Sequence, residues 1–229
     1  MDTILITGAN RGLGLEFVRQ YAEEGAKIFA CCRHPKEAQE LQALQNEHAN
    51  IQIYTLDVAD PDSIQALANE IKEPIDILLN NAGMLEKEED LENISMDAFN
   101  QTFLVNSVAP LKMAQAFAQN VANSQRKLIA NISSSMGSIS DNTSGGYYSY
   151  RSSKAALNML MKSAGIDLAP QGIRVLLLHP GWVKTRMGGS EATTEPADSI
   201  RGMRKVIRNY QPAPGEVMFF RYNGEVVPW

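Results

Sequence analysis

Residues 3–14 read TILITGANRGLG, an apolar run that leads directly into a turn with three glycines. The run fits a buried strand, and the residues after the last glycine have the apolar spacing of a helix. Glycines permit backbone angles that other residues avoid, and they leave the amides at the helix start open to a phosphate. This strand–turn–helix order predicts a nucleotide-binding turn, with a tight turn that binds nothing as the alternative. The candidate cofactor-binding residues here are Gly8, Asn10, Arg11, Gly12, Leu13 and Gly14.

Short apolar runs alternate with longer amphipathic segments along most of the chain. The expected strands are 3–7, 27–31, 51–56, 76–80, 127–132 and 174–178, and the expected helices are 13–24, 35–47, 61–72, 96–122 and 149–169. Strands that are apolar on both faces are typical of a parallel sheet covered by crossover helices. The pattern therefore predicts an α/β fold, a Rossmann-type doubly wound parallel sheet of about seven strands with helices on both faces.

The chain is expected to form one domain, 1–229, that binds the dinucleotide and carries the catalytic groups. Residues 188–196 are rich in Gly, Ser, Thr and Glu, and 201–208 have the pattern of a short basic helix. We therefore expect 187–210 to hold a substrate loop and a short helix. Residues 217–229 contain two apolar runs around Asn223–Gly224, which predicts an edge strand and a packed tail.

Composition excludes several classes of protein. The net charge of −5 argues against nucleic acid, because binding phosphates needs a basic surface. No apolar stretch approaches the roughly 20 residues of a membrane span, and the start has no basic leader, so a cytoplasmic protein is expected. The adjacent Cys31 and Cys32 point to opposite faces of a strand, which excludes a disulfide framework. The three histidines lack metal-ligand spacing, so no metal site is assigned.

The residues at the end of the second strand indicate which nicotinamide cofactor binds. An acid that would bind the adenosine ribose is absent there, and Arg33 follows the strand while Arg11 lies in the turn. Two guanidinium groups suit the 2′-phosphate of NADP, although either arginine also fits an ordinary surface charge.

Two later strand ends carry further candidates for cofactor binding. Asp57 and Val58 follow the third strand, where the carboxylate suits the adenine amino group or, alternatively, caps the next helix. Asn80, Ala82 and Gly83 close the fourth strand and permit close approach of the cofactor, or simply form a sharp turn.

Tyr150 and Lys154 lie one turn apart on the same face of a predicted helix. Carbonyl reduction leaves an alkoxide that needs a proton, and a phenol can donate it. A nearby ammonium favours the phenolate, so Lys154 is expected to lower the pKa of Tyr150. The spacing alone is common on helix surfaces, and it gains weight from the other strand-end motifs.

Three more motifs complete the constellation. Serines at 133–135 follow the fifth strand, where a hydroxyl can polarise a substrate carbonyl. Asn106 interrupts an apolar helical pattern, and its amide either holds a water that links it to Lys154 or is satisfied by backbone. After the sixth strand, the candidate residues for holding the nicotinamide are Pro180, Gly181, Val183 and Thr185.

In this order the motifs resemble those of the short-chain dehydrogenase/reductase family over nearly the whole chain. The matching patterns are TGxxxGxG at 7–14, NNAG at 80–83, the asparagine at 106, the serine at 134, YxxxK at 150–154 and PGxxxT at 180–185. Within the family, the run SSSMGSI, the GGYY approach to Tyr150 and Trp229 resemble the C-factor and sniffer-type carbonyl reductase group. The resemblance implies NADPH-linked reduction of carbonyls and, in some members, a role in signalling.

The resemblance also assigns roles within the site. Ser134 is chosen as the active serine because Gly137 stands where the family's glycine follows it. Residues 141–146 lengthen the loop between serine and tyrosine relative to the commonest members, so Ser133 and Ser135 remain alternatives. Lys154 is also expected to hold the nicotinamide ribose, and Tyr150 to lie beside the cofactor.

The sequence thus predicts an NADP-dependent oxidoreductase that reduces an aldehyde, ketone or quinone, with catalytic residues Asn106, Ser134, Tyr150 and Lys154. The alternative is an NADP(H)-binding signalling or sensor protein with little turnover. Small and apolar residues on several faces of 96–122 and 149–169 predict a homodimer or homotetramer. The substrate itself and the direction of the reaction stay open.

Overall fold

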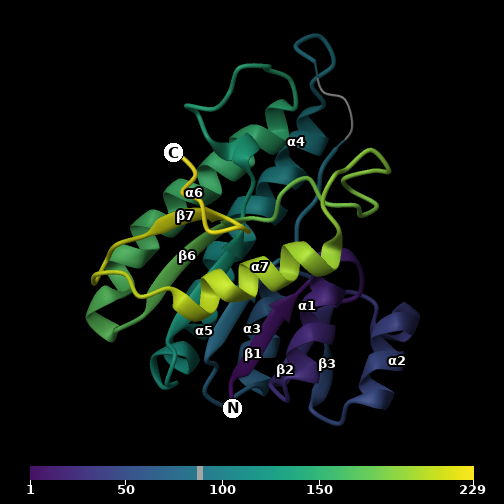
Figure 1. Cartoon of the computed structure of the whole chain (residues 1–229), viewed down its shortest axis with the longest axis vertical. Helices are drawn as coiled ribbons and strands as arrows, with labels where there is room; N and C mark the ends of the chain where they lie inside the picture. Colours follow the sequence, from purple (N-terminus) through teal and green to yellow (C-terminus); the bar gives the residue numbers. More distant parts are fainter. Residues whose placement is uncertain (87–89) are drawn as a thin grey trace.

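The computed structural model describes residues 1–86 and 90–229, which form a seven-stranded parallel sheet between two layers of helices (Figure 1). The strands follow the order β3-β2-β1-β4-β5-β6-β7, and each neighbouring pair is parallel. Their bounds are β1 Thr3–Thr7, β2 Lys27–Cys32, β3 Ile51–Thr55, β4 Ile77–Asn80, β5 Leu128–Ile132, β6 Arg174–His179 and β7 Met218–Arg221. The predicted doubly wound Rossmann-type fold is confirmed.

The helices cover both faces of this sheet. They are α1 Gly12–Glu23, α2 Gln39–Glu47, α3 Pro61–Glu70, α4 Met96–Phe103, α5 Ala109–Ala122, α6 Tyr148–Leu168 and α7 Pro196–Asn209. One core lies between the sheet and α1, α2 and α7, and includes Phe17, Leu41 and Met203. The second core lies on the other face against α3, α5 and α6, and includes Ile64, Phe117 and Met161. Strand side chains alternate between the two cores, which explains why the strands are apolar throughout.

Three expected elements differ from those observed. The helix expected over 96–122 is interrupted by a π-helical turn at Leu104–Val108, beside Pro110, whose missing N–H removes one helical hydrogen bond. The segment 35–47 is a 3₁₀ turn, Pro35–Glu37, followed by α2. The basic helix expected over 201–208 begins earlier, because Pro196 suits the first turn of a helix. The edge strand expected within 217–229 is β7, which pairs with β6.

The parallel strands bring four predicted motifs to one edge of the sheet. The carboxyl ends of β1, β4, β5 and β6 lead into the glycine turn, the NNAG segment, the serines and the proline–glycine exit respectively. Within residues 1–86 and 90–229, no helix is long and apolar enough to cross a membrane. Cys31 and Cys32 are buried and form no disulfide.

Candidate active site

The turn between β1 and α1 needs its glycines for two physical reasons. Gly8 and Gly12 have φ angles of 66° and 55°, in the left-handed region where a side chain is strained. A Cβ on Gly14 would lie 2.1 Å from the carbonyl oxygen of Gly8. No described side chain caps α1, and its first turn carries no acid. The free N–H groups at its start are therefore available to an anion, as the sequence predicts.

The segment after β4 is fastened to this turn by hydrogen bonds that the sequence analysis missed. The Thr7 hydroxyl accepts from the backbone N–H groups of Asn81 and Ala82, each at 3.0 Å. The Asn81 amide donates to the carbonyl oxygens of Thr7 at 2.8 Å and Gly8 at 3.2 Å. Thr7 and Asn81 thus hold Ala82 and Gly83 against the glycine turn. The sequence signal for these bonds was the polar residues Thr7 and Asn81, which lie at the ends of the neighbouring strands β1 and β4.

The side chain of Asn80 contacts the neighbouring strand. Its amide is 3% exposed and donates to the Oδ1 atom of Asn131 at 2.8 Å. Asn131 in turn donates to the carbonyl oxygen of Leu176 on β6. This buried chain of amides links β4, β5 and β6 and gives the Asn80 side chain a structural role, while the cofactor contact expected of Asn80 stays a prediction.

Three arginines gather beside the glycine turn, one more than expected. Burial lowers the pKa of Arg11, and the positive charges of Arg186 and Arg33 lower it further, which shows that they lie near one another. None of the three forms an ion pair with a carboxylate in the described part of the chain. Arg186 was missed, although a basic residue directly after the candidate Thr185 was a usable signal. Because these cations repel one another and none pairs with a carboxylate, an anion bound between them would be stabilised.

Asp57 does not cap α3, so the alternative interpretation from the sequence is wrong. The cap is Asp60, whose carboxylate accepts from the backbone N–H of Asp62 at 3.0 Å. Asp57 accepts from the backbone N–H of Ala59 at 3.0 Å, and its own N–H donates to the Ser63 hydroxyl. These bonds fix the half-buried carboxylate at the carboxyl edge of β3, next to Val58.

Tyr150 and Lys154 lie on the same buried face of α6, as the sequence predicts. Tyr150 is 9% exposed and Lys154 is 4% exposed. The Lys154 Nζ atom lies 5.8 Å from the centre of the Tyr150 ring and donates to the carbonyl oxygen of Ile132 at 2.8 Å. That bond ties the start of α6 to the end of β5, so the helix cannot shift without breaking it.

The sequence predicts that the pKa of Tyr150 is lowered. For the protein by itself this prediction is wrong. Burial raises the pKa of Tyr150, and the hydrogen bond with Ser134 offsets only part of this rise. Burial also lowers the pKa of Lys154 to about 8, which weakens its hold on a positive charge. Desolvation therefore outweighs the attraction that the sequence analysis emphasised, and Tyr150 is a neutral, proton-bearing phenol.

The structure distinguishes two of the three candidate serines. The Ser134 side chain lies near enough to Tyr150 to lower its pKa, and its Oγ atom accepts from the backbone N–H of Met136 at 3.2 Å. The Ser133 hydroxyl donates to Asn158 within the core at 2.7 Å. A Cβ on Gly137 would lie 2.8 Å from the Lys154 backbone, so glycine lets this loop pack directly on α6. Ser134, and not Ser133, is therefore the serine that lies near Tyr150, and Ser135 stays the alternative.

Asn106 lies in the π-helical turn, fully buried. Its Oδ1 atom accepts from the backbone N–H of Met84, and its Nδ2 atom donates to the Met84 carbonyl oxygen, both at 2.9 Å. It also donates to the Ser153 hydroxyl at 3.1 Å. Of the two alternatives from the sequence, the amide satisfied mainly by backbone is the one observed. A Cβ on Gly83 would lie 3.3 Å from Asn106 Oδ1 and 3.7 Å from Lys154 Nζ, so these groups converge.

The exit from β6 brings the last predicted motif beside the glycine turn. Gly181 has a φ angle of 87°, and a Cβ on Gly12 would lie 3.7 Å from the Thr185 methyl group. The Thr185 hydroxyl accepts from the backbone N–H of Gly188 at 3.2 Å, and the buried Val183 carbonyl accepts from Thr185 N–H at 2.8 Å. This segment closes the site on the side opposite the NNAG segment.

The start of α7 is attached to that exit. Ser199, which the sequence analysis missed, donates to the carbonyl oxygen of Pro180 at 2.6 Å. The loop before α7 folds back, because Thr194 N–H donates to the Trp182 carbonyl at 2.9 Å. Within residues 1–86 and 90–229, no cluster of three or more His, Cys, Asp or Glu side chains is placed to hold a metal ion.

Known proteins share both the sequence and the fold. Residues 2–196 match the short chain dehydrogenase family. The C-signal protein of Myxococcus xanthus is 42% identical over 156 residues, which cover 68% of this chain and 93% of that protein. The carbonyl reductase Sniffer of D. melanogaster superposes with a TM-score of 0.93 at 36% identity, covering all of both chains. NADPH-bound carbonyl reductase from chicken fatty liver gives the same score and identity over 100% of this chain and 99% of that one.

The span that matches the family covers the glycine turn, Asn106, Ser134, Tyr150 and the buried Lys154. The chain is therefore an oxidoreductase of the short-chain dehydrogenase family.

Proposed function

We propose that this protein is an NADP-dependent carbonyl reductase that converts an aldehyde, ketone or quinone to the alcohol. The observation that carries the proposal is the buried pair of Tyr150 and Lys154, with the Lys154 Nζ atom 5.8 Å from the centre of the Tyr150 ring, at the sheet edge that also holds the glycine turn. The two similar structures described above support it, since both are carbonyl reductases and one of them has NADPH bound.

The residues at the sheet edge fit NADP. The glycine turn leaves the start of α1 open, because a Cβ on Gly14 would collide with the backbone. Arg11, Arg33 and Arg186 form a positive cluster suited to the 2′-phosphate. The residues that would hold the cofactor are Gly8, Asn10, Arg11, Gly12, Leu13, Gly14, Arg33, Asp57, Val58, Ala82, Gly83, Tyr150, Lys154, Pro180, Gly181, Val183, Thr185 and Arg186. When bound, NADPH supplies the hydride that reduces the carbonyl carbon.

Each catalytic side chain has a separate task in this proposal. Ser134 hydrogen-bonds the carbonyl oxygen and orients it toward the Tyr150 hydroxyl. Tyr150 donates its proton to that oxygen, a role that suits a phenol whose pKa is raised by burial. The ammonium of Lys154 then stabilises the phenolate. Asn106 acts as a positioning residue, because its amide holds the Met84 backbone against Ser153.

The test compares Tyr150→Phe with Tyr148→Phe in NADPH absorbance assays on a panel of aldehydes, ketones and quinones, with NADH in parallel. Tyr150→Phe removes only the proton donor, so kcat should fall by roughly 10²- to 10⁴-fold while NADPH still binds. Tyr148→Phe, on the same helix, should leave turnover near normal.

Three results would change this conclusion. Near-normal turnover by Tyr150→Phe would remove Tyr150 from the mechanism. Better activity with NADH would contradict the interpretation of Arg11, Arg33 and Arg186. Tight NADPH binding with no consumption on any substrate would favour the signalling or sensor protein.

We also propose that the protein assembles as a homodimer or homotetramer through α4 and the π-helical turn. A groove of about 340 Å³ there is lined by Phe99, Asn100, Phe103, Leu104 and Val108. The rings of Phe99 and Phe103 stack at 5.9 Å along it. In the predicted homo-oligomer, a second copy of the chain would pack into this groove.

A further inference from the structure

A polar cavity lies at the opposite edge of the sheet from the candidate active site, where the strands begin. It has a volume of about 140 Å³ and is lined by residues from the start of β1, the end of α1 and the second half of α7. Figure 1 shows where these three elements lie. Its polar lining residues are Asp2, Tyr21, Glu24, Arg126, Arg204 and Arg208. Strands of this length separate the two edges by roughly 15 Å, so this cavity is distinct from the candidate active site.

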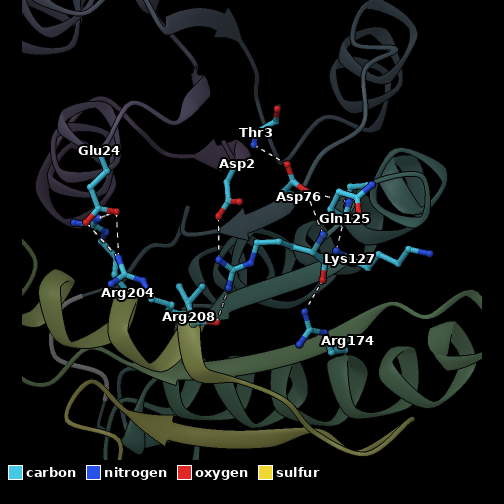
Figure 2. A network of polar contacts seen from close by, with 12 residues as sticks. Asp2, Thr3, Glu24, Asp76, Gln125, Lys127, Arg174, Arg204 and Arg208 are labelled. Carbon is cyan, nitrogen blue, oxygen red and sulfur yellow. Dashed lines mark hydrogen bonds and ion pairs between the residues drawn. The ribbon is translucent and has the colours of Figure 1, made fainter.

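Positive charge exceeds negative charge around this cavity. Glu24, directly after α1, forms ion pairs with both Arg204 and Arg208 of α7. Asp2 accepts from Arg126 at 2.9 Å, and the other terminal nitrogen of Arg126 donates to the Ile207 carbonyl. Figure 2 shows these contacts joining α1, α7 and the loop before β5. Three guanidinium groups therefore face two carboxylates.

Two donors in the cavity wall have neither a hydrogen-bond partner nor an ion pair within residues 1–86 and 90–229. They are the Tyr21 hydroxyl and the Nε atom of Arg204. Tyr21 is 6% exposed and Arg204 is 9% exposed, and the guanidinium lies 4.6 Å from the centre of the Tyr21 ring. Buried donors without acceptors are rare in native proteins. An acceptor that enters the cavity would satisfy both.

We propose that this cavity binds a small oxyanion, a carboxylate or a phosphate, that accepts hydrogen bonds from Tyr21 and Arg204. An anion balances the third arginine, and its oxygens match two donors that share one wall. The volume accommodates a molecule the size of several waters. Apolar atoms of Ala26 and Ile207 complete the lining and suit a short carboxylate.

The bound oxyanion stabilises the contact between α1 and α7. Gln20 already bridges these helices, because it donates to the Ala197 carbonyl at 3.0 Å and accepts from Arg204 at 2.9 Å. A ligand that contacts Tyr21 and Arg204 adds a second bridge. Binding to the folded state alone raises the melting temperature with ligand concentration.

The experiment measures binding by calorimetry and melting temperature, with saturating NADP to occupy the cofactor's phosphate site. The probes are sodium phosphate, acetate, propionate and succinate at constant ionic strength. At least one probe should bind saturably. Which probes bind then shows whether the cavity prefers a phosphate or a carboxylate. Tyr21→Phe should weaken this binding by at least roughly tenfold. Without a probe, Tyr21→Phe should be no less stable than the parent, because it removes an unsatisfied buried hydroxyl.

Arg201→Gln is the matched control, since Arg201 is exposed on α7 and pairs with Asp198. It removes a positive charge from α7 outside the cavity and should leave probe binding unchanged, which separates specific binding from general attraction to a basic surface. The proposal is overturned if no probe binds saturably, or if Tyr21→Phe binds the probe as well as the parent. Neither readout requires turnover, so these results are independent of the proposed reductase activity.

Discussion

The burial of Lys154 has a consequence for how the stability of the protein depends on pH. The residue is 4% exposed, and its ammonium is held by one carbonyl oxygen, that of Ile132. Removing the charge from water lowers the pKa of Lys154 from the ordinary 10.5 to about 8. The folded chain therefore releases this proton at lower pH than the unfolded chain does.

That difference predicts how stability varies with pH. Between about pH 8 and 10.5 the unfolded chain binds more protons at Lys154, so this residue makes the free energy of unfolding rise with pH. The shift corresponds to about 3 kcal/mol. Below pH 8 both states are charged and the cost of burial is complete. Urea unfolding at several pH values should show that the free energy of unfolding contains a rise between about pH 8 and 10.5 in the parent that is missing in Lys154→Met.

Other groups titrate in the same range, so the comparison between variants is what isolates Lys154. Burial raises the pKa of Cys31, which lies away from Lys154 and makes stability fall at high pH in both proteins alike. Lys112→Met, at an exposed position on α5, serves as the control and should follow the parent. Parallel curves for the parent and Lys154→Met would contradict the lowered pKa.

The sequence predicts those site residues whose role follows from local spacing. Tyr150 and Lys154 are one helical turn apart, so their shared face follows from helix geometry. Asn81 and Arg186 were missed because their contacts join segments far apart in the chain. The direction of the Tyr150 pKa was also wrong, since burial depends on the whole fold and spacing reports only the neighbouring charge.

Among the elements, the π-helical turn at Leu104–Val108 shows where local patterns stop being informative. Apolar periodicity continues through 96–122, so the sequence favours one uninterrupted helix. The break depends on Pro110 and on the side-chain bonds that Asn106 and Ser107 make with Ser153 of α6. The strands were predicted closely because each is a short apolar run bounded by turn residues.

The packing of α1 on the glycine turn predicts the effect of Gly14→Ala. Alanine ordinarily stabilises a helix by about 1 kcal/mol relative to glycine. Here the new Cβ would lie 2.1 Å from the Gly8 carbonyl oxygen, so the clash reverses the sign. Chemical unfolding should show lower stability, and NADPH affinity by titration should fall at least roughly tenfold.

Gly189→Ala is the control for that substitution. Gly189 has a φ angle of 79°, and a Cβ there meets no described atom within 4 Å. It should lose about 1–2 kcal/mol from backbone strain while NADPH affinity stays normal. An unchanged NADPH affinity in Gly14→Ala would argue against the turn as the phosphate site.

At the scale of the whole molecule, the two edges of the sheet carry different chemistry. The carboxyl edge holds the candidate active site, and the amino edge holds the arginine-rich cavity. Helix α7 extends along the sheet beside α1 and contacts both regions (Figure 1). Ser199 near its start contacts the exit from β6, and Arg204 in its second half lines the cavity.

The proposed oligomer is tested at the groove along α4. Asn100 is exposed and lines the groove, whereas its neighbour Gln101 is exposed and does not line it. Asn100→Arg introduces a charge where a second copy would pack, so sedimentation equilibrium should show a smaller assembly. Gln101→Arg should keep the parent's mass. A monomeric parent, or an unchanged mass for Asn100→Arg, would contradict this interface.

The hydrogen bonds between Thr7 and Asn81 have a consequence for a chain still under synthesis. They join residues 74 positions apart, and Thr185 closes the other side of the same turn much later in the chain. The amino-terminal half emerges from the ribosome first and contains the glycine turn without its later walls. A nascent chain therefore gains stabilisation from the nucleotide only when most of it has been translated, and ligand-assisted folding is confined to the final stage.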